Sequence, residues 1–302
     1  MKLKVFVICS ALLLIMVILG TGMAYGSNDR FLKNNPVVTF PDPGLDAVIR
    51  GNIGKYDGDL RVSDVEKLVN LSALNMGIKD LTGLEYCTNL QNAFLMENEI
   101  SDLTPVLNLP NLVCIWLNNN KIQVIPDLSS LPKLNSIFLD GNQISDISSL
   151  SGMRNLMGIT LNYNQINDIS PLAHLYKLQL LAIRGNQVSD LSPLQYLVNL
   201  TSLDCAENNI SDVSPLSHLN ITQYFNLSNN RISDISSLAG TITALQLDLS
   251  GNNIEDISAL VEPKPRINGI VFRYNLENNP LNEHSLESCI PELRSYGVQV
   301  YF

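Results

Sequence analysis

The stretch from 134 to 155, LNSIFLDGNQISDISSLSGMRN, contains the pattern that decides the fold. Its apolar residues stand at fixed distances before and after one Asn, and they are Leu134, Ile137, Leu139, Ile144, Ile147 and Leu150. The Asn recurs every 22 residues, at Asn98, Asn120, Asn142, Asn164, Asn186, Asn208, Asn230 and Asn252. A fixed period of this length is typical of a solenoid, in which each repeat forms one turn of a coil.

A single repeat cannot fold alone. It offers about seven apolar side chains, each worth about 1.5–3 kcal/mol when fully buried. Ordering its backbone costs about 1–2 kcal/mol for every residue. Neighbouring repeats must therefore share one core and hydrogen bond to one another. The recurring Asn lies where the chain turns off a strand, and its amide can satisfy backbone groups of a buried turn. We interpret this column as structural.

The repeat reads L-x-x-I-x-L-x-x-N-x-I and resembles the bacterial 22-residue class of leucine-rich repeat. It is similar in particular to the repeat region of internalin-type surface proteins, over roughly residues 38–302. The resemblance implies an α/β repeat solenoid, a curved right-handed coil with a parallel β-sheet on its concave face. Short 3₁₀ or α turns would form the convex face, and the concave face would bind another protein. Residues 40–45, 68–71 and 77–84 resemble the amino-terminal cap of the same proteins.

The sequence divides into five segments. Residues 1–26 are predicted to be a secretory signal peptide, because two lysines precede an apolar run and Ala24-Tyr25-Gly26 fits a cleavage site. An uncleaved anchor is the alternative, since residues 5–23 are 19 uncharged residues that could just span a bilayer. A flexible lead-in (27–37), an amino-terminal helical cap (38–69), the 22-residue leucine-rich repeats (70–281) and a carboxy-terminal cap (282–302) follow.

The return path of each repeat has its own pattern. A Ser or Thr precedes Pro at 104–105, 170–171, 192–193 and 214–215, which is typical of a helix that starts with a hydroxyl cap. We therefore expect one helical turn on the convex side of most repeats. Residues 121–132 lack this pattern and predict an extended return path, and the prolines within 262–266 predict a surface loop.

Composition excludes several classes of function. The net charge of −10 argues against nucleic acid and anionic membranes as partners. Much of this acidity comes from one Asp per repeat, so we assign it to the scaffold rather than to a basic partner. The five cysteines include no C-x-x-C pair, which argues against a zinc site or a disulfide framework and favours buried free thiols.

Counting back from each recurring Asn identifies candidate binding residues. Strand side chains alternate between the two faces of a sheet, so offsets −6, −4 and −2 should be exposed on the concave face. Aromatic residues occupy offset −4 in three consecutive repeats, which places them about 5 Å apart. The candidate residues are Phe94, Met96, Trp116, Asn118, Phe138, Asp140, Thr160, Asn162, Arg184 and Asp204.

These features predict a non-enzymatic protein of a bacterium-like source, secreted or exposed on the cell surface, that binds a protein ligand through its concave face. A membrane would be a partner only if the leader stays uncleaved. A carbohydrate-binding module that uses Phe94, Trp116 and Phe138 as a platform is one alternative, and a structural envelope component is another. The three aromatic residues could also simply stack and cover the strands.

Catalysis finds little support in the sequence. The histidines, His174, His218 and His284, have no nucleophile in a matching column. One carboxylate per repeat lacks the clustered oxygens of a calcium site, and no Gly-rich phosphate loop is present. We therefore expect no catalytic residues, no metal and no cofactor.

Overall fold

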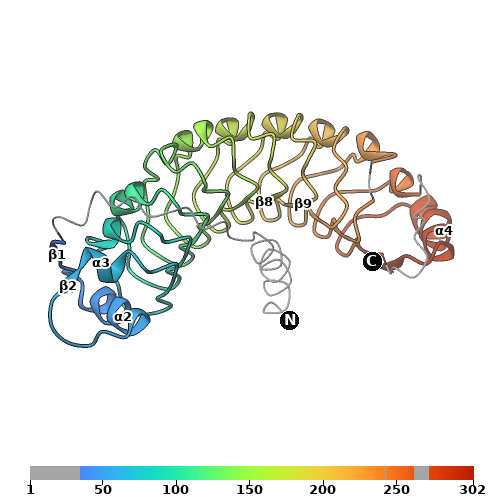
Figure 1. Cartoon of the computed structure of the whole chain (residues 1–302). Helices are drawn as coiled ribbons and strands as arrows, with labels where there is room; N and C mark the ends of the chain where they lie inside the picture. Colours follow the sequence, from blue (N-terminus) through green and yellow to red (C-terminus); the bar gives the residue numbers. More distant parts are fainter. Residues whose placement is uncertain (1–34, 242, 262–271) are drawn as a thin grey trace.

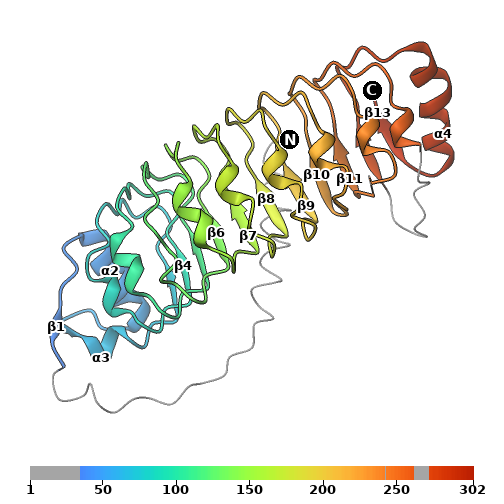
Figure 2. The same cartoon turned by 90° about the horizontal axis from the view of Figure 1, so that it is seen from above.

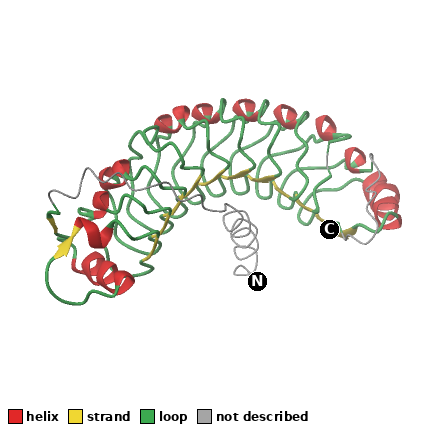
Figure 3. Ribbon diagram, viewed as in Figure 1, coloured by secondary structure: helices red, strands yellow, loops and turns green. Residues whose placement is uncertain are grey.

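The computed structural model describes residues 35–241, 243–261 and 272–302, which form a curved solenoid (Figure 1). The strands follow the inner, concave edge of the arc and the helical turns follow the outer, convex edge (Figure 3). Seen from above, the repeats stand side by side along the length of the molecule (Figure 2). The predicted signal peptide and the predicted loop at 262–266 lie outside the described residues.

The concave sheet contains 11 strands within the described part of the chain, in the order of the sequence. Neighbouring strands pair in parallel, and most partners are 22 residues apart, as in Ser136 with Gly158. The strands are β3 (Asn70–Ser72), β4 (Asn92–Phe94), β5 (Cys114–Trp116), β6 (Ser136–Phe138), β7 (Gly158–Thr160), β8 (Leu180–Ala182), β9 (Ser202–Asp204), β10 (Tyr224–Asn226), β11 (Gln246–Asp248), β12 (Arg273–Asn275) and β13 (Gln299–Tyr301).

Single turns of 3₁₀-helix form the convex side. They are η1 (Leu84–Tyr86), η2 (Thr104–Asn108), η3 (Ser148–Gly152), η4 (Ser170–Leu172), η5 (Ser192–Leu194), η6 (Ser214–Leu216), η7 (Ser236–Leu238) and η8 (Ser258–Leu260). The segment 121–132 forms no helical turn, and Val124 instead makes a parallel bridge to Asp146. The predicted extended return path is therefore confirmed.

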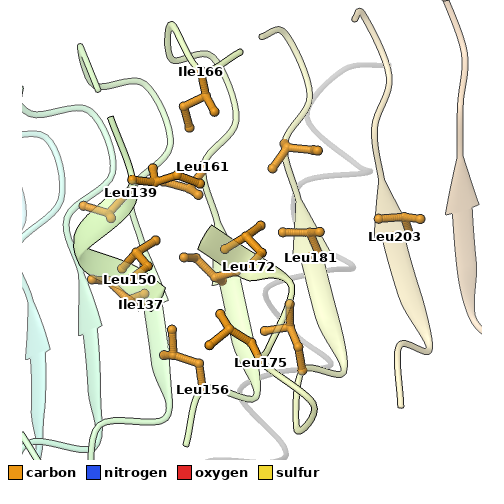
Figure 4. Close-up of a cluster of buried hydrophobic side chains, with 14 of the residues drawn as sticks. Ile137, Leu139, Leu150, Leu156, Leu161, Ile166, Leu172, Leu175, Leu181 and Leu203 are labelled. Carbon is orange, nitrogen blue, oxygen red and sulfur yellow. The ribbon is translucent and has the colours of Figure 1, made fainter. Parts of the chain in front are cut away.

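One continuous core fills the space between the strands and the convex turns. It runs from Val38 to Val300 through every described repeat. Ile137, Leu139 and Leu150 are all fully buried. Their side chains lie beside the equivalent residues of the next repeats (Figure 4). No repeat has a private core, which explains why burial favours folding only for a stack.

The recurring asparagines connect each repeat to the one before it. The Asn164 Nδ2 atom donates to the carbonyl oxygens of Leu161 and Asn162 in its own turn and to that of Leu139 in the preceding repeat. Its Oδ1 atom accepts the N–H of Ile144, also in the preceding repeat, at 3.0 Å. The side chain is buried, so no water replaces these bonds. The structural interpretation of this column is confirmed.

The residue before each of these asparagines adopts positive φ. Gly fills this position at Gly141, Gly185 and Gly251, and Asn, Glu or Tyr fills it elsewhere. At Gly185, an added Cβ atom would lie 2.5 Å from the ring of Tyr163 in the preceding repeat. Glycine is therefore required there by both the backbone conformation and the close approach of a neighbouring side chain.

The helical turns are not capped by a hydroxyl as predicted. In η4 the residue at the N-cap position is Ile169, and no side chain caps the turn. The Asp two residues before each Ser or Thr instead accepts the backbone N–H of that Ser or Thr. This bond measures 2.8 Å in Asp168–Ser170 and in the seven equivalent pairs of the other repeats. In several repeats the hydroxyl itself also donates to the Asp carboxylate. The acidic column is thus part of the scaffold.

The amino-terminal cap consists of β1 (Val37–Val38) paired antiparallel with β2 (Leu60–Arg61), α2 (Pro43–Ile53) and α3 (Val62–Val65). Asp42 joins this cap to the first repeat. Its Oδ1 atom accepts the N–H of Gly44 and Leu45 at the start of α2, and its Oδ2 atom accepts the N–H of Lys79 and Asp80. One buried carboxylate therefore fixes the helix against the solenoid.

Asn35 is also bonded to the amino-terminal cap. The Asn35 side chain donates to Ser63 Oγ at 2.8 Å and accepts the Ser63 N–H at 3.0 Å. At the other end, the π-helical turn η9 (Ser285–Cys289), α4 (Ile290–Ser295) and β13 cover the last repeat. Leu293 and Val298 of this segment are buried. Both apolar ends of the stack are thereby covered.

Replacing one recurring Asn tests its contribution to stability. Asn164→Ala leaves several buried backbone groups without partners, and each such group costs about 1–3 kcal/mol. We expect the free energy of unfolding to fall by at least about 2 kcal/mol in urea denaturation. Asn155→Ala is the matched control, because Asn155 is an exposed residue of the preceding repeat that donates to Pro132 O. A loss no larger than that of the control would show that the column is dispensable.

The acidic column predicts a loss of stability in acid. Hydrogen bonds from the Ser or Thr hold the pKa of five of these carboxyls below the ordinary Asp value, namely Asp102, Asp146, Asp212, Asp234 and Asp256. A lowered folded-state pKa stabilises the protein above about pH 4 and ceases to do so as the pH falls through that lowered value. Asp212→Ala should lower the Tm at neutral pH and reduce the further loss between about pH 4 and pH 2. Equal acid sensitivity in the variant would contradict this origin.

Candidate functional site

The three aromatic candidates form one stack on the concave face. They come from β4, β5 and β6, whose register pairs Phe94 with Trp116 and Trp116 with Phe138. The ring centroids of Phe94 and Trp116 are 4.3 Å apart with 13° between the planes. Those of Trp116 and Phe138 are 5.2 Å apart with 5° between the planes. We call these three residues the aromatic stack.

The aromatic stack is less exposed than its positions predicted. Phe138 is only 5 % exposed, and Phe94 and Trp116 are partly buried. Cys114 and Leu180 pack with Phe138 and Trp116 in a small apolar cluster separate from the main core. The expectation of exposed strand positions is therefore wrong for Phe138 and Cys114. Side chains on the inside of a curved sheet converge, so neighbours in register cover one another.

The apolar surface continues toward the amino-terminal cap. Leu74 is 49 % exposed, and Met96, in the same column of the next repeat, is partly exposed. Together with the aromatic stack, Leu74 and Met96 form what we call the concave strip. Apolar surface gathered in this way, beside polar groups, is typical of the centre of a protein interface.

Four polar candidates lie together beside the aromatic stack, and all four are buried, contrary to the expected exposure: Asn118, Asp140, Thr160 and Asn162. The Asp140 Oδ2 atom accepts from Asn118 Nδ2 at 3.1 Å, and its Oδ1 atom accepts the Asn162 N–H at 2.9 Å. Asn162 Oδ1 in turn accepts the N–H of Arg184. Asp140 and Asn162 thus satisfy backbone N–H groups at the ends of the strands.

The buried carboxylates of this face have unusual protonation behaviour. Burial raises the pKa of Asp140 to about 6, although hydrogen bonds from Thr160 and Asn162 oppose that rise. Burial also raises the pKa of Asp204 to about 6, against a hydrogen bond from the Ala206 N–H and the attraction of Arg184. Both groups therefore change charge near neutral pH, which no pattern in the sequence indicated.

Arg184 contacts residues that the offsets did not select. Its Nη2 atom lies 2.5 Å from Glu207 Oε1, and its guanidinium lies 5.9 Å from the centroid of the Tyr163 ring. Both partners stand one residue before a recurring Asn, at positive φ. Including the position one residue before each recurring Asn among the candidates would have identified both partners. Asp204 lies in the next repeat but does not pair with Arg184, and it accepts the Ala206 N–H instead.

No group of three or more His, Cys, Asp or Glu in the part of the chain that the structure describes could hold a metal ion. The exposed His174 lies beside Tyr176, with Nδ1 at 2.9 Å from the Tyr176 hydroxyl. Cys87, Cys114, Cys205 and Cys289 are buried and free. None of the helices described is both long and apolar enough to cross a membrane.

Known proteins share this repeat architecture. A family model described as Leucine Rich repeats (2 copies) matches residues 110–152 and 176–218. A crystal structure of internalin C2 from Listeria monocytogenes is similar, with 36 % sequence identity and a TM-score of 0.67. The similarity covers 70 % of this chain and 97 % of that one. The chain belongs to the internalin family of leucine-rich repeat proteins.

Other solved structures share this fold with the chain. The internalin inlF from Listeria monocytogenes is 26 % identical with a TM-score of 0.64, over 87 % of this chain and 90 % of that one. Plant peptide hormone receptor RGFR1, solved in complex with RGF2, is 20 % identical with a TM-score of 0.55, over 72 % of this chain and 40 % of that one. At that identity the receptor shares the fold alone. No curated protein matches this internalin.

The buried Asp140 predicts an effect of pH on stability that is opposite to that of the acidic column on the convex side. Its folded-state pKa of about 6 lies above the unfolded value of 3.8, so the folded state binds the proton more tightly. Its contribution to stability therefore rises as the pH falls from about 7 to about 4, by roughly 1.4 kcal/mol per unit of pKa shift. Asp140→Asn keeps the shape and removes the charge, and should be at least as stable as the wild type at neutral pH. A clear loss in its urea midpoint at neutral pH would contradict this.

Proposed function

We propose that this internalin-family protein is a non-enzymatic, secreted or surface-exposed bacterial protein that binds another protein through its concave face. The observation that carries the proposal is the concave strip, which places a rigid aromatic stack beside the more exposed Leu74 and Met96. The proposed contact residues are Phe94, Met96, Trp116, Asn118, Phe138, Asp140, Thr160, Asn162, Arg184 and Asp204.

The stacking supports a binding role because it fixes the rings before a partner arrives. Trp116 lies between two rings that belong to neighbouring strands, with interplanar angles of 13° and 5°. A side chain already held in one orientation loses little conformational entropy on binding. The buried Phe138 supports the ring that a partner would touch. Aromatic anchors of this kind contribute much of the affinity in protein interfaces.

The same stacking argues against a carbohydrate platform. A sugar stacks on the open face of an aromatic ring, whereas both faces of Trp116 are covered by Phe94 and Phe138. The edges of the rings remain available, and they suit apolar protein side chains and carbonyl oxygens better, because a ring edge carries partial positive charge. A structural envelope component would associate with itself, which sizing at several concentrations would detect.

The family supports a protein partner in general, without indicating which one. The solved relatives include internalins, and the leucine-rich repeat fold also forms a plant peptide hormone receptor. Secretion is consistent with the apolar leader of the sequence. The partner is unknown, so its identification belongs to the test.

Changing Trp116 to Ala tests the concave face. Proteins captured by the wild type from culture medium and host extracts would be purified, and their Kd measured by calorimetry. We expect Trp116→Ala to weaken binding at least tenfold while circular dichroism shows a folded protein, because the variant removes the centre of the stack. Tyr196→Ala, at a convex position that is 64 % exposed, should leave the Kd unchanged. Equal affinity for the wild type and Trp116→Ala would move the site away from this face.

A further inference from the structure

One charged residue of the concave face is not required by the fold. Column −2 reads Asn118, Asp140 and Asn162 in three consecutive repeats. Asn162 uses its side chain in the same way as Asp140, because Asn162 Oδ1 accepts the N–H of Arg184 in the next repeat just as Asp140 Oδ1 accepts that of Asn162. An Asn at position 140 could make the same bond. The negative charge therefore needs another explanation.

The surroundings of Asp140 leave hydrogen-bonding capacity unused. A carboxylate only accepts hydrogen bonds, so the amide nitrogen of Asn118 must face it, at 3.1 Å. The Asn118 Oδ1 atom consequently points away, and it has no partner among the residues that the structure describes. Asn118 is only 9 % exposed, so this oxygen is a buried acceptor without a donor. Such an atom normally costs about 1–3 kcal/mol.

The charge of Asp140 is also uncompensated. No Lys or Arg of the described residues forms an ion pair with it. Arg184, two repeats further along the same column, is paired with Glu207. A buried carboxylate without a cation is unfavourable, whereas one that meets a hydrogen-bonded cation is stabilised. The free protein therefore holds an acceptor group that suits an incoming cation.

We propose that Asp140 and Asn118 Oδ1, beside Thr160, form a subsite that takes a basic side chain, arginine or lysine, of the protein partner. The proposal rests on the proposed function of the concave strip. The subsite adjoins Trp116 and Phe138, so a basic side chain inserted there would come from a partner whose apolar neighbours cover the strip. Arginine suits the site best, because its planar guanidinium offers several donors to separate acceptors at once.

The test uses peptides as the probe. A random peptide library displayed on phage would be selected on the wild-type protein, and peptides that lose at least tenfold in affinity on Trp116→Ala would be kept as ligands of the concave strip. We expect these peptides to contain an Arg or Lys near an apolar residue. Asp140→Asn should weaken them at least tenfold. Asp248→Asn, at a concave position five repeats from Phe138 of the aromatic stack, is the matched control and should not.

A second arm isolates the charge. Replacing the peptide's Arg by citrulline, which has nearly the same shape and no charge, should weaken binding at least tenfold on the wild type and less than twofold on Asp140→Asn. If Trp116→Ala abolishes binding while Asp140→Asn and citrulline have no effect, the subsite is overturned and the concave strip stands. If no selected peptide depends on Trp116, the proposed function itself is overturned.

Discussion

The structure depends on the amide of one Asn in every repeat, which is hydrogen bonded to its own turn and to the turn before it. Each amide bonds to the preceding repeat, so the Asn98 Oδ1 atom accepts the N–H groups of Met76 and Ile78 in the first repeat. The first repeat therefore needs no Asn of its own, which explains Met76 at that position. At the same boundary Asp42 accepts four backbone N–H groups, and although burial raises its pKa, those bonds hold the pKa below the ordinary value. Polar bonds thus join every repeat to its predecessor and the first repeat to the cap.

Much of the fold could be predicted because its period is visible in single residues. The Asn and Leu columns located the strands, and the missing Ser-Pro pattern at 121–132 located the repeat without a helical turn. The hydrogen bonding at the start of each helical turn could not be predicted, because Asp168 and Ser170 are both suitable acceptors two residues apart. In the structure the Asp168 carboxylate accepts the Ser170 N–H at 2.8 Å, and no side chain caps η4.

The row in which the candidate residues lie could be predicted from the sequence, but their exposure to solvent could not. Offset counting correctly placed the rings of Phe94, Trp116 and Phe138 in one row, because the parallel strands pair in strict register. It could not show that curvature brings neighbouring columns together until Phe138 is buried by Leu180 and Trp116. It also could not reveal how Asp140 differs from Asn118. The two residues occupy equivalent positions in the sequence column. The difference appears only in the structure, because burying a charged carboxylate costs more free energy than burying a neutral amide.

Tight packing of the concave face would change how it recognises the proposed partner. A face of loosely exposed side chains could adapt to many shapes, at the cost of ordering them on binding. Here the rings are stacked, the amides are bonded between repeats and Arg184 is held by Glu207, so little is left to be ordered. A rigid face binds tightly to a partner that fits it and weakly to one that leaves a buried polar group unpaired. Affinity would then come from the edges of the concave strip, whereas selectivity would come from the few polar groups that stay unsatisfied when the face is empty.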